Sequence, residues 1–448
     1  MQKIKVFSII IIILSIFIKN ISDVYGLNND SSDISSKINA EGYVIMDANN
    51  HDILFSKNEN NRYEPASVTK IMTAILVIEN VQDLHTKITI GENPPKTEPS
   101  SIYLVQGEII DIKSLLYALL LQSANDAAVA LAEYVGGSVK GFEKMMNDKA
   151  AALGCTNTHF ANPNGLHAEN HYTTAKDMAL ILSYAIKNQT LLDISQTEQY
   201  FIPETNLGPV REIYNQNRIL LKDNENYYDK AIFAKTGYTD EAQHTFAVAA
   251  KNDKMTLVAV FLKDSVKGYN IYAKDCLEYA FDNYTNHTIY NKGDFVINYN
   301  IKGTFVQLMA ENSINITIKN GTNIVKNISD IVLIDPERYS YSKGEEVATS
   351  KLIINGISYD LALESKEDIT LASTVNSIDN NVTKSIAEQS TSKDIAVFLR
   401  NKPNNLIISA AFGICIIICL LVIFIFLNTK YRKKNYRKRG KKRKIRQS

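Results

Sequence analysis

Three short motifs constrain this chain most, because a fold has to bring them together before any of them can act. They are Ser67-x-x-Lys70, Ser123-Ala124-Asn125 and Lys235-Thr236-Gly237, in that order along the chain. Together they offer a hydroxyl nucleophile, an amine base, a second hydroxyl that can relay a proton, and a cation with a hydroxyl that can hold an anion. The motifs predict one site assembled from segments far apart in sequence.

The first motif is expected at the start of an apolar helix that follows Pro65 and runs from Ser67 to about Glu79. Residues three apart share a helix face, so Lys70 can reach the Ser67 hydroxyl. A serine needs a base to become a good nucleophile, and Lys70 serves only when neutral. Burial and the nearby charge of Lys235 would favour the neutral amine. The free N–H of Ser67 can also stabilise an oxyanion.

The middle motif is expected between two apolar helices, the first of which Asp111 can cap. Ser123 can relay a proton between a lysine and a leaving amine. Asn125 can hold a substrate amide, because its side chain both donates and accepts hydrogen bonds. Taken alone, Asn125 is better explained as the cap of the helix that begins at Asp126, but the presence of the other two motifs reverses this preference.

The third motif is expected beside a pair of strands. There Lys235 and Thr236 can grip a carboxylate, and Gly237 lets a substrate backbone approach closely. The N–H of Tyr238 is the expected second oxyanion donor, beside that of Ser67.

Competing motifs are weaker. His167 and His171 stand four apart, but they follow the loop signal of residues 162–165 and match no zinc-binding helix pattern. Two further Ser-x-x-Lys matches, Ser340–Lys343 and Ser390–Lys393, open no apolar helix. We therefore expect no metal site and no cofactor.

Both ends of the chain carry membrane signals. Residues 6–18 are apolar and follow two lysines, which indicates a signal peptide, although an uncleaved anchor remains an alternative. Residues 406–427 contain no charge and are long enough to cross about 30 Å of hydrocarbon. The tail that follows, residues 428–448, has twelve Lys or Arg and no acid, whereas the rest of the chain has 37 basic and 48 acidic residues. This tail fits a cytoplasmic stop-transfer signal better than a nucleic-acid partner.

The pattern between these ends predicts an α+β fold. Residues 43–46 and 53–55 indicate one hairpin, residues 246–250 and 256–262 another, and a helical block lies between them. Cys155 and Cys276 could form a disulfide, but nothing in the sequence supports one. The expected organisation is a signal peptide (1–26), a linker (27–37), an α+β catalytic domain (38–285), a β-sandwich-like domain (288–366), a flexible stalk (367–405), a transmembrane helix (406–427) and a basic tail (428–448).

The motifs in their context resemble the low-molecular-mass penicillin-binding proteins, which are serine D-alanyl-D-alanine carboxypeptidases of the S11 type. Residues 65–74, 119–128, 159–167 and 234–239 carry the resemblance, which covers residues 38–285 firmly and residues 288–366 loosely. It implies a β-lactamase/transpeptidase-like catalytic domain.

The resemblance also implies a substrate and roles. The substrate is the peptidoglycan stem peptide ending in D-Ala-D-Ala, which Ser67 attacks while Lys70 and Ser123 move protons. Lys235 and Thr236 bind the terminal carboxylate, Asn125 and Gly237 contact the substrate, and β-lactams trap Ser67. The expected location is the cell membrane, held by one C-terminal span with the catalytic domain outside.

Two departures from the family pattern matter. Ala124 stands where glycine is common, and Gln243 stands where a glycine usually follows the third motif. Two other functions stay open at this point. One is a serine β-lactamase, which would hydrolyse the acyl-enzyme fast, and the other is a non-catalytic wall-binding or β-lactam-sensing membrane protein.

Overall fold

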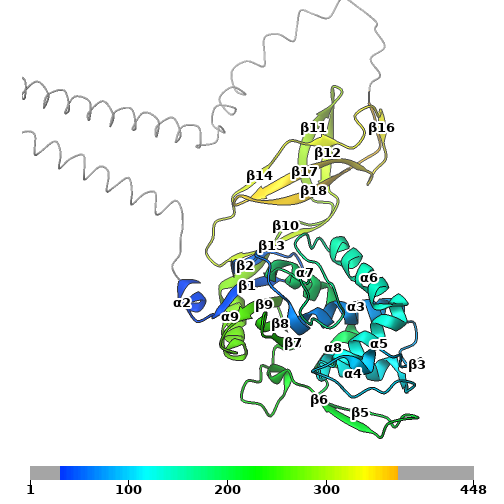
Figure 1. Cartoon of the computed structure of the whole chain (residues 1–448). Coiled ribbons are helices and arrows are strands. Elements are labelled where there is room, and N and C mark those ends of the chain that lie inside the picture. The colour runs from blue at the N-terminus through cyan, green and yellow to red at the C-terminus, as the bar shows by residue number, and fades with distance from the viewer. Residues whose placement is uncertain (1–30, 372–448) are drawn as a thin grey trace, which may run out of the picture. The chain divides into compact units, whose positions relative to one another are not determined.

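An antiparallel sheet joins segments from both ends of the catalytic region, as the sequence predicts. The computed structural model describes residues 31–371. The sheet has the order β2-β1-β9-β8-β7, and Figure 1 shows it between two groups of helices. Its strands are β1 (Ala40–Asp47), β2 (Ile53–Lys57), β7 (Ala231–Thr239), β8 (Gln243–Lys251) and β9 (Thr256–Asp264). Both predicted hairpins, β1–β2 and β8–β9, are confirmed.

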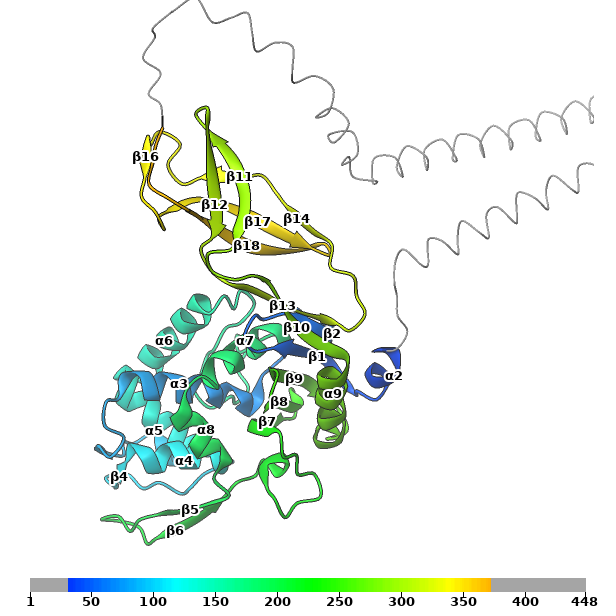
Figure 2. The same cartoon turned by 180° about the vertical axis from the view of Figure 1, so that it is seen from behind.

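Both faces of this sheet are buried, because alternate side chains of each strand pack against different layers. On β1, Val44 and Met46 join the core shared with the helical block, whereas Tyr43 and Ile45 join the core on the opposite face. The last helix, α9 (Tyr269–Asn283), contributes Leu277 and its neighbours to that second core. Figure 2 shows α9 and the helical block on opposite sides of the sheet.

The helical block lies between β2 and β7 in the chain. Its helices are α3 (Lys70–Asn80), α4 (Ile112–Leu121), α5 (Asn125–Gly136), α6 (Val139–Ala152), α7 (Ala175–Ala185) and α8 (Gln189–Gln196). Short 3₁₀ turns cover Ala66–Thr69, Pro94–Lys96 and Arg218–Leu220, and two small ribbons pair β3 (Lys87–Thr89) with β4 (Ile109–Asp111) and β5 (Gln199–Ile202) with β6 (Arg211–Tyr214).

Local sequence signals set several helix ends. The Asp111 carboxylate accepts a hydrogen bond from the N–H of Ser114, so it caps α4 as predicted. The Ser138 hydroxyl caps α6 in the same way. Gly137 ends α5 with a φ of 68°, a conformation that glycine adopts without steric cost.

The structure bears on two further predictions, the linker before the catalytic domain and the possible disulfide. The segment predicted as a linker contains a short helix, α2 (Ser31–Ser36), and Ile34 is buried in the second core. Cys155 and Cys276 are both buried and free, so the disulfide that the sequence left open does not form.

From Tyr284 onward the described chain contains strands and no helix. β10 (Tyr284–Tyr290) pairs with β13 (Ile314–Lys319), and the main sheet has the order β11-β12-β18-β17-β14 with β15 also on β17. The other strands are β11 (Phe295–Ile301), β12 (Thr304–Ala310), β14 (Lys326–Ile328), β15 (Val332–Leu333), β16 (Ser340–Tyr341), β17 (Glu346–Ile354), β18 (Ile357–Ser365) and β19 (Ile369–Thr370).

This β region is tied to the β1–β2 hairpin by two buried aspartates. Thr317 donates from its N–H to Asp52 (2.6 Å) and from its hydroxyl to Asp47 (2.7 Å), and the Tyr359 hydroxyl donates to Asp52 (2.8 Å).

The predicted signal peptide (1–26), most of the stalk (367–405), the transmembrane helix (406–427) and the basic tail (428–448) lie outside the described residues. Among residues 31–371, no helix has the length and apolar character needed to span a membrane.

Candidate active site

Ser67 lies in a 3₁₀ turn rather than in the first turn of an α-helix. The turn covers Ala66–Thr69, and α3 begins only at Lys70. The expected helix from Ser67 to about Glu79 is present, but its first turn is a 3₁₀ turn and not an α-helical one. Ser67 and Lys70 still face each other, with Oγ and Nζ 2.8 Å apart.

Lys70 is completely buried, and its amine has three neighbours. Nζ donates to the Asn125 side-chain oxygen (2.7 Å) and to the backbone oxygen of Asn164 (2.7 Å), and its third neighbour is the Ser67 hydroxyl. A neutral amine has two N–H donors and one lone pair, so these two acceptors leave the lone pair for the proton of Ser67. Burial, helped by the charge of Lys235, holds the pKa of Lys70 well below its usual value, while Asp126 opposes the shift.

Ser123 and Lys235 form a second hydroxyl–amine pair beside the first. The Lys235 ammonium donates to Ser123 Oγ (2.9 Å) and to the backbone oxygen of Thr236 (2.8 Å). Burial lowers the pKa of Lys235 to about 7. Ser123 has a φ of 58°, an uncommon conformation for a residue with a side chain, which aims its hydroxyl at the site from the turn between α4 and α5.

Asn125 does not cap the next helix, so the simpler explanation offered by the sequence was wrong. The cap position of α5 is Ala124, and Asn125 is its first residue. The Asn125 amide instead accepts the hydrogen bond from Lys70. Asp126, which follows it, accepts hydrogen bonds from the N–H groups of Ile102 and Leu104, and these bonds hold the loop before β4 against α5.

Strand β7 carries the third motif along the edge of the sheet nearest Ser67. A Cβ atom on Gly237 would lie 2.7 Å from the Ser67 nitrogen and 2.4 Å from Thr245 Oγ1, so only glycine allows this approach. The Thr245 hydroxyl donates to the backbone oxygen of Pro65 (2.8 Å), which ties β8 to the turn that carries Ser67. Tyr238, the expected source of the second oxyanion N–H, follows Gly237 on β7 with its side chain exposed.

Several residues at this site were missed by sequence reasoning. The Asn217 side chain accepts a hydrogen bond from the N–H of Thr236 (3.1 Å) and so fixes the strand edge. A hollow beside Thr236 is lined by two cationic side chains, Arg218 and Lys267, and by Tyr269. No motif marks these residues in the sequence.

The two histidines of the competing motif have different partners. His171 is buried, contacts the Thr69 hydroxyl (2.9 Å) and accepts from the N–H of Ala161; burial lowers its pKa to about 3. His167 is exposed and lies 2.9 Å from the Glu64 carboxylate. His171 is therefore a structural residue that keeps the 159–167 loop against the Ser67 turn.

Comparisons with known sequences agree with one another. Residues 28–266 match the family described as D-alanyl-D-alanine carboxypeptidase. DacF of Bacillus subtilis, a D-alanyl-D-alanine carboxypeptidase, is 31% identical over 342 residues, which are 74% of this chain and 86% of the relative. DacA of Escherichia coli, which carries the same description, is 33% identical over 256 residues, 55% of this chain and 61% of the relative.

A solved structure extends the comparison to the fold. Penicillin binding protein 5 from Haemophilus influenzae superposes with a TM-score of 0.61 at 26% identity, and the match covers 74% of this chain and 98% of that one. The penicillin-binding protein fold predicted from the motifs is therefore confirmed.

Proposed function

Because this chain belongs to the D-alanyl-D-alanine carboxypeptidase family, we propose that it releases the terminal D-alanine of peptidoglycan stem peptides with Ser67 as its nucleophile. The observation that carries this assignment is the 2.8 Å separation between the Ser67 hydroxyl and the buried amine of Lys70. Burial favours the neutral form of this amine, and a neutral amine is a base that can accept the hydroxyl proton.

In the proposed acylation step, Lys70 takes the proton of Ser67 while Oγ attacks the penultimate D-alanine carbonyl. The negative charge that develops on the carbonyl oxygen is stabilised by the N–H groups of Ser67 and Tyr238. Ser123 then gives its hydroxyl proton to the nitrogen of the departing D-alanine and takes the proton from Lys70 in return, which leaves Lys70 neutral again. In the hydrolysis step Lys70 takes a proton from the attacking water, and that proton returns to Ser67 Oγ when the ester bond breaks, which restores the Ser67 hydroxyl.

The substrate carboxylate is proposed to lie against Lys235 and Thr236. The Lys235 ammonium also donates a hydrogen bond to Ser123, so the carboxylate site and the proton-relay hydroxyl are directly connected. Arg218 and Lys267 line the adjacent hollow and add positive charge on the same side. This positive charge would favour a peptide with a free C-terminal carboxylate over an internal peptide segment, which has none. β-Lactams carry a carboxylate and a reactive amide, so they should acylate Ser67.

The test is the mass shift of the full-length chain with penicillin, followed by peptide mapping and an assay of D-alanine release from a pentapeptide. We expect the label on Ser67 and loss of both label and release in Ser67→Ala. Ser340→Ala is the matched control, since the exposed Ser340 begins another Ser-x-x-Lys match, and it should behave as wild type. Label on another serine would refute the assignment. A label that disappears within seconds, with penicillin turned over, would favour a β-lactamase.

We also propose that the catalytic region lies outside the cell, anchored by residues 406–427. The charge-free run followed by the cationic tail supports this orientation. Release of an active fragment from intact cells by an external protease would support the anchor, and activity recovered only from the cytosol would contradict it.

A further inference from the structure

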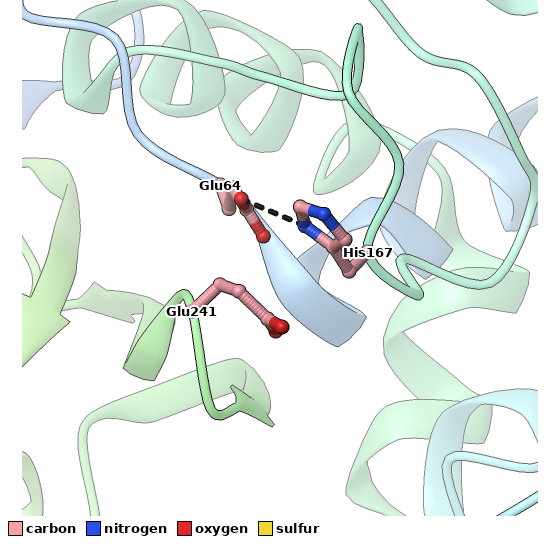
Figure 3. A group of neighbouring side chains, drawn as sticks. All are labelled: Glu64, His167 and Glu241. Carbon is pink, nitrogen blue, oxygen red and sulfur yellow. Dashed lines mark hydrogen bonds and ion pairs between the residues drawn. The ribbon is translucent and has the colours of Figure 1, made fainter.

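A cluster of three metal-ligating side chains lies outside the chemistry described so far. Glu64, His167 and Glu241 each offer one ligand atom, and these atoms lie within 4.8 Å of one another. Figure 3 shows the three side chains converging from separate segments, with the dashed line between Glu64 and His167. That contact joins Glu64 Oε1 and His167 Nδ1 at 2.9 Å.

The three segments that carry this cluster are the ones that enclose Ser67. Glu64 precedes the Ser67 turn, His167 ends the loop that supplies the acceptor of Lys70, and Glu241 lies in the β7–β8 turn after Gly237. Their backbones are held close together. The 159–167 loop touches the Ser67 turn, since a Cβ on Gly165 would lie 1.9 Å from the Ala66 oxygen. Strand β8 is joined to the same turn by the hydrogen bond from Thr245 to Pro65. The side chains can therefore adjust while their backbones stay in place.

The charges in the cluster are unbalanced. Two carboxylates face one imidazole, and no side chain in residues 31–371 donates a hydrogen bond to the Glu241 carboxylate. A divalent cation would supply the positive charge that the two carboxylates attract.

We propose that Glu64, His167 and Glu241 bind a divalent transition-metal cation at the rim of the active site. One imidazole nitrogen and two carboxylate oxygens form a ligand set that suits Zn²⁺. Zinc holds such ligands at about 2.0–2.2 Å, which puts neighbouring ligand atoms about 3.3 Å apart. Rotation of the half-buried Glu64 and of the exposed His167 and Glu241 side chains has to bring these atoms together from spacings of up to 4.8 Å. Water fills the remaining position, and the proton shared by Glu64 and His167 leaves to solvent when the metal binds.

The metal is assigned a structural effect and no catalytic step. It would cross-link the Ser67 turn, the 159–167 loop and the β7–β8 turn, which lie close together around Ser67. The Ser67–Lys70 pair is complete without it. Binding and carboxypeptidase activity are therefore separable, and either inference can fail without the other.

The experiment is equilibrium dialysis of the full-length chain, prepared without a polyhistidine tag, against Zn²⁺ at controlled free concentration. We compare wild type with His167→Ala and Glu241→Gln, and with His85→Ala, an exposed histidine remote from the cluster, as the matched control. Wild type and His85→Ala should bind one more Zn²⁺ than either cluster variant, or bind it about tenfold or more tightly. The comparison between variants also removes any contribution from Cys415 and Cys419. Penicillin labelling of each variant verifies that it is folded.

Two results would overturn the proposal. One is equal Zn²⁺ binding by wild type, His167→Ala and Glu241→Gln, and the other is no stoichiometric binding by wild type. A third measurement tests the imidazole itself. Zn²⁺ retained against a large excess of Mg²⁺ supports a nitrogen ligand, whereas displacement by Mg²⁺ would contradict the role of His167. The melting temperature offers an independent readout, since Zn²⁺ should raise that of wild type and His85→Ala alone.

Discussion

Gly237→Ala should separate the geometry of the oxyanion site from its chemistry, because it adds one methyl group and removes no functional atom. The new methyl would lie 2.7 Å from the Ser67 nitrogen and 2.4 Å from Thr245 Oγ1. Thr245 cannot turn away without losing its bond to Pro65. Strand β7 therefore has to retreat by roughly 1 Å to restore ordinary contact distances. A misplacement of that size at a reacting centre costs about 100-fold, and loss of an oxyanion donor about 100- to 1000-fold.

The assay is the second-order rate of acylation by a fluorescent penicillin, measured together with the melting temperature. We expect the rate for Gly237→Ala to fall about 100-fold or more, with a cost in stability of about 1–3 kcal/mol from overpacking. Gly208→Ala is the matched control, since a Cβ there would lie no closer than 3.4 Å to any atom. It should acylate at the wild-type rate. A wild-type acylation rate in Gly237→Ala would show that β7 does not approach Ser67 as described.

Three further predictions concern charge and backbone strain. The value of kcat/KM should rise with pH as Lys70 loses its proton and fall at higher pH as Lys235 loses its own. The pH of this fall should lie below 10.5, the usual pKa of lysine. In the kcat profile the fall should occur at higher pH, because the bound substrate carboxylate stabilises the Lys235 ammonium. Gln243→Gly should stabilise the chain by about 0.5–1 kcal/mol, read as a rise in melting temperature of about 1–2 °C, because Gln243 has a φ of 53°. A lowered melting temperature would mean that the glutamine makes a compensating contact. Arg218→Gln should raise KM about two- to fivefold with little change in kcat, since Arg218 is an exposed cation beside Thr236; an unchanged KM would exclude it from carboxylate binding.

The parts of the fold that could be predicted depend on local signals. Asp111 and Ser138 cap helices because a short side-chain oxygen before an apolar run satisfies free N–H groups wherever that run packs. The β8–β9 hairpin follows from two apolar runs with a polar turn between them. The start of α3 was misjudged because residues 67–69 form a 3₁₀ turn, and the residue pattern does not distinguish such a turn from the first turn of an α-helix.

The parts of the site that could not be predicted depend on backbone atoms and on long-range pairing. Lys70 donates to the backbone oxygen of Asn164, and a backbone oxygen leaves no mark in the residue pattern. Asn217 and Thr245 act through single hydrogen bonds to Thr236 and Pro65, which only the folded chain brings near them. Gln243 shows the reverse case. Its departure from the usual glycine was visible in the sequence, but the reason for that glycine, a left-handed backbone, was not.

The active site combines strained backbone conformations with two buried lysines at one edge of the sheet, and the charge of Lys235 affects the protonation of Lys70. Ala66 and Ser123 hold strained backbone conformations, each costing about 1–3 kcal/mol, and Lys70 and Lys235 are buried without an acid bonded to either amine. A lysine kept neutral below its ordinary pKa costs about 1.4 kcal/mol per pH unit. The burial of both faces of the sheet offsets this free-energy cost. Lys235 therefore has two effects at once: its charge offers a partner for the substrate carboxylate, and the same charge helps to keep Lys70 neutral before any substrate arrives.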